Sequence, residues 1–149
     1  MKLTIHEHSA YAYTGGKSWK QGQAGVVFVH GALHDHSVWI LQSRYLAHHG
    51  YNVMAVDLPG HGRSAGPALD VPAAGQWLAQ CVDAAGWDRV YWVGHSMGSL
   101  IALEAAGQRA HVTQGLFMLG TAYPMKVSAT LLQMSDRKST RLNSSHVKR

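Results

Sequence analysis

The sequence contains a single cysteine, few charged residues and no long apolar run, and each shortage narrows the classes to which it can belong. Cys81 has no second cysteine with which to form an internal disulfide, which fits a reducing compartment. No apolar stretch approaches the length that spans a membrane, and the N-terminus lacks the apolar segment of a signal peptide. We therefore expect a cytoplasmic protein that does not insert into a membrane.

Charged residues make up only 14% of the chain, and the net charge of +5 is unevenly distributed. Residues 136–149 hold five of the 13 lysines and arginines, whereas residues 1–135 carry eight basic and seven acidic side chains. The body of the chain is therefore nearly neutral and offers no basic surface to a nucleic acid. With 149 residues, 46% of them hydrophobic, the chain is long enough for one globular domain with a substantial core.

Short apolar runs alternate with helical patterns along the chain. Six runs predict strands, at residues 3–5, 10–13, 26–29, 53–56, 90–93 and 116–119. The continuous apolar runs 26–29 and 53–56 are expected to be buried on both faces of the sheet. Helices are expected between the last four strands, over residues 37–49, 70–85 and 99–109. In the first of them Val38, Leu41 and Tyr45 fall on one face, which gives that helix an apolar side. The alternation predicts a doubly wound, mostly parallel α/β sheet with helices on both faces.

The motif Gly94-His95-Ser96-Met97-Gly98 joins the fifth of these strands to the helix that follows it. A serine on a sharp strand-to-helix turn presents its hydroxyl at the end of a sheet. Glycines flank such a serine because a Cβ would clash in so tight a turn. This nucleophile elbow makes Ser96 the candidate catalytic nucleophile. A glycine-rich turn without chemistry is the alternative interpretation.

Three motifs occur together in the order and spacing of one family: Val26–Ala32, Asp57–Ser64 and Gly94–Gly98. With them, residues 1–135 resemble the N-terminal part of an alpha/beta-hydrolase domain. The resemblance is to the small serine-esterase-like branch, which carries a short helical cap. It implies that residues 123–135 begin the cap and that the sequence stops before the last strands of the sheet.

The resemblance also implies a role for the residues of these motifs. Ser96 would attack an acyl carbonyl to form an acyl-enzyme, and the backbone N–H groups of Ala32 and Met97 would form the oxyanion hole. The elbow and the loop would be supported by His30, Gly31, Gly94, His95 and Gly98. Within this set His30 is expected to brace the loop rather than to act as a base. Asp57 is expected to organise its own glycine-rich turn.

The family's chain order places an Asp or Glu and then a His after the nucleophile. Between Ser96 and residue 135 only Glu104 and His111 carry such groups, and the helix leads both of them away from the serine. We therefore expect the fragment to be inactive on its own, because the acid and the histidine of the triad are missing. Residues 136–149 look non-native, since Asp136–His146 matches a translated sequencing adapter, although a natural basic tail is the alternative.

The expected function is hydrolysis of carboxylic esters, or of thioesters or lactones, with a small acyl compound as the substrate. No nucleic acid and no membrane are expected as partners, and the oligomeric state stays open. No cofactor and no metal are expected, because His34 and His36 lack the further ligands that a metal site needs. Two alternatives remain at this point. One is a non-catalytic relative that binds a small molecule, and the other is a carbon–carbon hydrolase or perhydrolase of the same fold.

Overall fold

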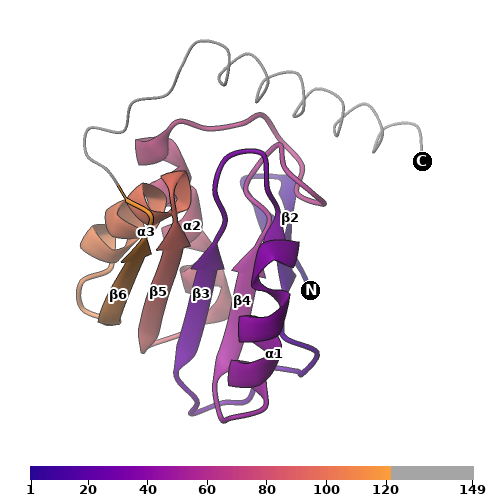
Figure 1. The fold of residues 1–149 in the computed structure, drawn as a ribbon, viewed down its shortest axis with the longest axis vertical. Helices are drawn as coiled ribbons and strands as arrows, with labels where there is room; N and C mark the ends of the chain where they lie inside the picture. The colour runs from indigo at the N-terminus through magenta and orange to yellow at the C-terminus, as the bar shows by residue number, and fades with distance from the viewer. Residues whose placement is uncertain (122–149) are drawn as a thin grey trace.

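The computed structural model describes residues 1–121, which form one six-stranded sheet with helices on both faces (Figure 1). The strands are β1 (Lys2–Ile5), β2 (His8–Tyr13), β3 (Gly25–Val29), β4 (Asn52–Val56), β5 (Val90–His95) and β6 (Thr113–Leu119). They lie in the order β1-β2-β4-β3-β5-β6. The hairpin of β1 and β2 is antiparallel and joins β4 antiparallel, whereas β4, β3, β5 and β6 run parallel to one another. The predicted doubly wound, mostly parallel sheet is confirmed.

Helices cover the two faces of the sheet and make its central strands fully buried. The helical elements are η1, a 3-10 turn (His36–Trp39), α1 (Ile40–Ala47), α2 (Val71–Ala85) and α3 (Met97–Gln108). Figure 1 shows α1 on one face and α2 and α3 on the other. Every residue of β3 and β4 is buried as a result, which explains why the two strands consist almost entirely of apolar residues.

Capping residues that can be read from the sequence fix the start and the end of α2. The Asp70 side chain accepts a hydrogen bond from the backbone N–H of Ala73 (2.9 Å), and Pro72 occupies the first turn. The helix ends at Gly86, whose φ of 70° favours glycine. Its inner side includes Leu78 and the fully buried Cys81.

The inward face of α1 differs from the expected one. The apolar side expected from the sequence is exposed, with 44, 79 and 62% of the surface accessible at Val38, Leu41 and Tyr45. Trp39, Ser43 and Ala47 are buried instead. The physical reason is close packing, because a Cβ on Gly15 would overlap Ser43 and Ala47. The small Ser43 and Ala47 of α1 therefore pack inward against Gly15, and Leu41 and Tyr45 are turned outward.

The parallel strands all end at one edge of the sheet, and the chain segments with the candidate chemistry lie there. These segments are the loop after β3, the loop after β4 and the turn between β5 and α3. Ligand sites of open parallel sheets form at this carboxyl edge. The expected cap (123–135) and the basic segment (136–149) lie outside the described residues. No helix in residues 1–121 is long and apolar enough to cross a membrane.

The outer side of β6 generates a prediction about self-association. Within residues 1–121 β6 pairs only with β5, and Phe117 is 55% exposed on it. An unpaired apolar edge strand is a template for pairing with another chain. We expect the chain to self-associate at micromolar concentration and Phe117→Lys to reduce this association in sedimentation velocity. Leu103→Lys on α3 adds the same charge at a similarly exposed site (47%) and should change little. A monomeric wild-type chain would contradict this expectation.

Candidate active site

Ser96 occupies a strained turn between β5 and α3. Its φ of 56° and ψ of −123° are a backbone conformation that residues with a side chain rarely adopt. Its backbone N–H donates to Leu119 O on β6 (2.8 Å), and its carbonyl accepts from the N–H of Ser99 (3.0 Å). The residue is half-buried rather than enclosed in the core. Hydrogen bonds on both sides of the turn therefore hold Ser96 in a backbone conformation that is unfavourable for a residue with a side chain.

Two hydroxyl groups reinforce this turn. The fully buried Ser99 donates its hydroxyl to the carbonyl of Ser96 (2.5 Å). It accepts in turn from the hydroxyl of Thr121, which follows β6 (2.6 Å). Sequence reasoning selected neither residue. The only available signal was a serine in the first turn of the helix behind the elbow, a position where a side chain can reach back to the preceding carbonyl.

Gly94 and Gly98 are required by space. A Cβ on Gly94 would overlap the backbone of Gly98 and Ser99, and a Cβ on Gly98 would overlap the carbonyl groups at the end of β3. Neither glycine has a positive φ. The close approach of α3 to the backbone of β3 and β5 is therefore what demands glycine at both positions.

The loop after β3 passes beside Ser96. A Cβ added to Gly31 would lie 3.4 Å from Ser96 Cβ and 3.5 Å from His34 Nδ1, so these two side chains border the same methyl-sized space. Ala32 is half-buried in this loop, and Leu33 has a φ of 66°. The structure thus brings the expected loop to the expected serine. It also brings His34 there, which the sequence analysis weighed only as a metal ligand.

His30 connects this loop to the loop after β4. The side chain is fully buried, and burial lowers its pKa from 6.5 to about 4, so the ring is neutral at pH 7. Its Nε2 accepts from the backbone N–H of Leu58 (3.1 Å), which leaves the proton on Nδ1 to be donated to Gly31 O (2.8 Å). Both nitrogens are therefore occupied by the backbone, an arrangement that supports a bracing role.

Asp57 holds the loop after β4 in place and also binds His36 of η1. The fully buried carboxylate accepts from the backbone N–H of Arg63 (2.8 Å). It also accepts from the backbone N–H and the ring Nδ1 of His36 (2.7 and 2.8 Å). A Cβ on Gly62 would overlap this carboxylate. His36 is therefore half-buried and anchored to Asp57.

Three of these groups are close enough to raise the question of a metal. Asp35, His36 and Asp57 offer ligand atoms that all lie within 4.8 Å of one another. An oxygen of Asp35 already accepts from the N–H of Ser37 (2.8 Å), and an oxygen of Asp57 accepts twice from His36. These bonds use the same atoms that an ion would need, so we assign no metal or cofactor site to them.

Of the remaining candidate residues, two lie at the elbow and two lie farther along the chain. His95 ends β5 as an exposed side chain, and Met97 begins α3, where the positive end of the helix dipole favours a negative charge. Glu104 and His111 are exposed, one on α3 and one beyond its end. The described residues therefore bring together a strained serine, a helix N-terminus and a braced loop.

Similarity to known proteins agrees with this geometry. A sequence model of the alpha/beta hydrolase fold family matches residues 26–144. The (E)-2-((N-methylformamido)methylene)succinate hydrolase of Acinetobacter baylyi is 31% identical over 108 residues, which cover 70% of this chain and 41% of that protein. The pimeloyl-(acyl-carrier protein) methyl ester esterase of Methylococcus capsulatus is 30% identical over 123 residues, which cover 74% of this chain and 45% of that protein.

Solved structures give the same result at the level of the fold. The crystal structure of a membrane phospholipase A matches with a TM-score of 0.74 at 26% identity, over 82% of this chain and 39% of that one. The chain thus spans less than half the length of each of these three relatives.

The packing at Gly98 leads to a prediction about stability. Gly98→Ala should lower the free energy of unfolding by roughly 2–3 kcal/mol, because the added methyl group meets backbone that cannot give way. Gly107, on the same helix, has no atom within 4 Å of an added Cβ. Gly107→Ala should therefore raise stability by about 0.5–1 kcal/mol through its helix propensity. Urea unfolding of both variants is the measurement, and equal effects would refute the packing argument.

The buried His30 predicts how stability depends on pH. Its folded pKa of about 4 lies below the ordinary 6.5, so between these values the unfolded chain binds a proton that the folded chain does not. Stability contributed by neutral His30 is therefore present above pH 6.5 and is lost as the pH falls toward 4. Between pH 7 and 4.5 the wild type should lose roughly 2 kcal/mol more than His30→Asn in urea unfolding. Equal losses would show that His30 is not held neutral.

Proposed function

The chain belongs to the alpha/beta hydrolase fold family, and on that premise we propose that it is the nucleophile-bearing part of a serine hydrolase that cleaves carboxylic esters. The observation that carries the proposal is the backbone of Ser96, held at a φ of 56° at the start of α3. Strain of this kind costs about 1–3 kcal/mol and gathers where function requires it. A structural turn could use glycine here without that cost.

In the proposed reaction Ser96 Oγ attacks the carbonyl carbon of the ester. The serine proton passes to a general base and then to the leaving alcohol as its C–O bond breaks. Water next attacks the acyl-enzyme and releases the carboxylic acid, which restores the hydroxyl of Ser96. Each step passes through a tetrahedral species whose oxygen carries a negative charge.

That charge needs donors already in position, and we assign this role to the backbone N–H groups of Ala32 and Met97. Two observations support the assignment. Met97 is the first residue of α3, where N–H groups have no partner within the helix. Gly31, immediately before Ala32, lies against the Ser96 side chain, and His30 holds the start of this loop. Loss of one such donor typically lowers turnover by a factor of about 10²–10³.

The base and the acid that orients it belong, in this proposal, to a longer protein. Family order places them after the nucleophile, and in residues 97–121 only Glu104 and His111 carry suitable groups. Both are exposed and follow α3 away from the turn. We therefore expect the 149-residue chain alone to react slowly, because the Ser96 hydroxyl is a weak nucleophile without a base.

The substrate proposed for the longer protein is a small acyl compound. A serine nucleophile forms acyl-enzymes, which suits esters, thioesters and lactones. Of the two curated relatives, the methyl ester esterase is named for this class, whereas the name of the other supports hydrolysis in general. At about 30% identity they suggest the reaction class, while the acyl group would be selected by parts of the protein beyond the described residues.

A fluorophosphonate probe, which reacts with activated serines, tests the proposal. The chain extended to the length of its relatives should be labelled at Ser96, and labelling should disappear in Ser96→Ala. The 149-residue chain should react at least about 10³-fold more slowly, because it lacks the groups that activate the serine. Peptide mapping by mass spectrometry gives the labelled position, and Ser37→Ala serves as a control at an exposed serine.

Each result has a distinct meaning. No labelling of the extended protein, or labelling at another residue, would overturn the proposed nucleophile and favour a non-catalytic binding protein. Fast labelling of the 149-residue chain that Ser96→Ala abolishes would overturn the expected inactivity alone. In that case His34→Ala is the next variant, because His34 borders the same space as Ser96.

A further inference from the structure

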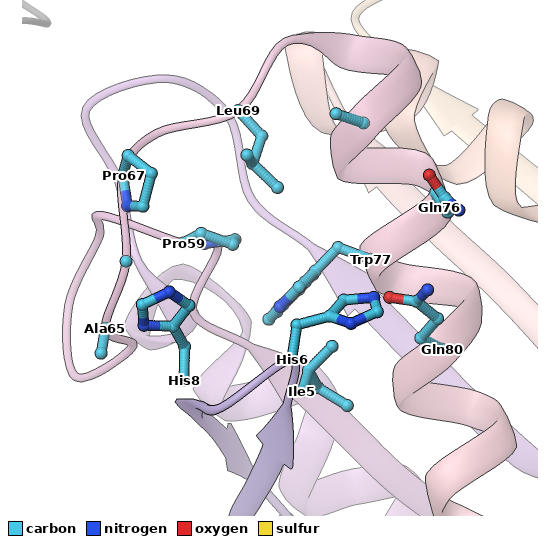
Figure 2. A pocket seen from close by; sticks show the side chains of 12 residues that line it. Ile5, His6, His8, Pro59, Ala65, Pro67, Leu69, Gln76, Trp77 and Gln80 are labelled. Carbon is cyan, nitrogen blue, oxygen red and sulfur yellow. The ribbon is translucent and has the colours of Figure 1, made fainter.

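One hollow in the described residues lies away from Ser96. It has a volume of about 300 Å³ and lies between the β1–β2 turn, the loop after β4 and the first turns of α2 (Figure 2). Its apolar lining includes Ile5, Pro59, Leu69 and Trp77, and none of its residues comes from β3, β5 or α3. In the sheet order β4 and β3 separate this hollow from β5, and β6 lies at the opposite edge.

Trp77 brings a polar group without a partner to this hollow. The side chain is only 7% exposed, and Figure 2 shows its indole projecting from α2 toward the turn that carries His6. Two other indoles are bonded, Trp19 to Val53 O (2.8 Å) and Trp92 to Thr113 Oγ1 (2.9 Å). The indole N–H of Trp77 makes no hydrogen bond to any described residue. Within residues 1–121 the buried side-chain atoms without a hydrogen-bond partner are Trp39 Nε1 and Ser43 Oγ, so the N–H of Trp77 is open to solvent. A ligand oxygen in the hollow can therefore replace water as its acceptor.

The lining also limits the charge of the ligand. It contains no carboxylate, ammonium or guanidinium group, and its only titratable side chains are His6 and His8, both exposed. A carboxylate in this hollow would lose water without gaining a fixed counter-ion, which is costly. An uncharged carbonyl oxygen can accept from the indole N–H without that penalty.

The turn that carries His6 is itself unusual. His6 and Glu7 have φ values of 49° and 68°, where two-residue hairpin turns normally use Asn, Asp or Gly. Within residues 1–121 the other two residues with a side chain and a positive φ are Leu33 and Ser96, both at the candidate active site. Backbone strain gathers at functional positions, and this turn is the second place where the molecule concentrates it.

We propose that this hollow binds a small uncharged molecule with a flat apolar body and one carbonyl oxygen. The oxygen accepts a hydrogen bond from Trp77 Nε1, and the apolar body packs against Pro59 and Leu69. A volume of about 300 Å³ is at the lower end for ligand pockets and suits a single substituted ring. The site is separate from Ser96 and does not depend on the proposed hydrolase activity.

Benzamide is a matched probe because it offers one ring and one neutral carbonyl. The chain has five tryptophans, so its two-dimensional ¹H–¹⁵N spectrum should contain five indole N–H signals. We expect benzamide to shift one of them saturably, with a Kd of about 1 mM. The signal that moves should be the one that is missing in Trp77→Phe. The signals of Trp19 and Trp92, whose N–H groups already have acceptors, should stay in place.

Two further ligands separate the parts of the proposal. Toluene keeps the ring but has no acceptor, and it should bind at least about tenfold more weakly through loss of one hydrogen bond. Benzoate should also bind more weakly, because the hollow offers its charge no fixed counter-ion. Equal binding of toluene would overturn the role of the indole N–H, and tighter binding of benzoate would overturn the uncharged class.

Three variants control for location. Ala73→Leu narrows the hollow without touching the indole N–H and should weaken benzamide binding, whereas Ala84→Leu makes the same change on the exposed side of α2 and should not. Ser96→Ala should bind benzamide like the wild type, which separates this site from the candidate active site. An unmoved Trp77 signal at about tenfold higher benzamide, or equal shifts of all five signals, would overturn the proposal.

Discussion

The contact between α3 and the backbone of the sheet is the constraint on which the rest of the candidate active site depends. Gly94 and Gly98 let the helix approach β5 and β3 so closely that no Cβ fits between them. The chain must then reverse from strand to helix within one residue, and Ser96 is that residue, at a φ of 56°. A helix placed farther from the sheet would allow a relaxed turn. Packing at the two glycines thus sets the sharp turn, and the strain arises because a serine rather than a glycine occupies its centre.

Buried hydrogen bonds also fix the loops that lie beside this turn. His30, neutral because burial lowers its pKa, joins the loop after β3 to the backbone at Leu58. Asp57, one residue before Leu58, accepts three N–H groups from His36 and Arg63. Each of these buried groups has a hydrogen-bond partner in the backbone or in a neighbouring side chain. The loops are therefore fixed without leaving either group unpaired. The Gly31 loop can therefore remain against Ser96 without contributing a helix or a strand of its own.

The sequence carries the strands and the elbow well because their signals are local. Unbroken apolar runs mark β3 and β4, and Gly-x-Ser-x-Gly between a strand and a helix marks the turn at Ser96. Contacts that depend on register are not written locally. Thr121 reaches Ser99 only because β6 pairs with β5, and the outward Leu41 contradicts the face that its spacing suggested. The tertiary approach of small residues to the sheet decided the orientation of α1, and no pattern within that helix could reveal it.

The two edges of the sheet differ in backbone strain. This difference helps to distinguish turns that serve stability from turns that serve function. At the amino edge the loops before β3, β4 and β5 reach positive φ with glycine, at Gly22, Gly50 and Gly86. At the carboxyl edge, residues with side chains take this conformation at Ser96, at Leu33 and in the β1–β2 turn. Strain at one edge only is hard to attribute to folding, because the same sheet closes its opposite loops without it. The buried strands β3 and β4 lie between the β1–β2 turn and the turn at Ser96, and they supply the rigidity that such strained turns need.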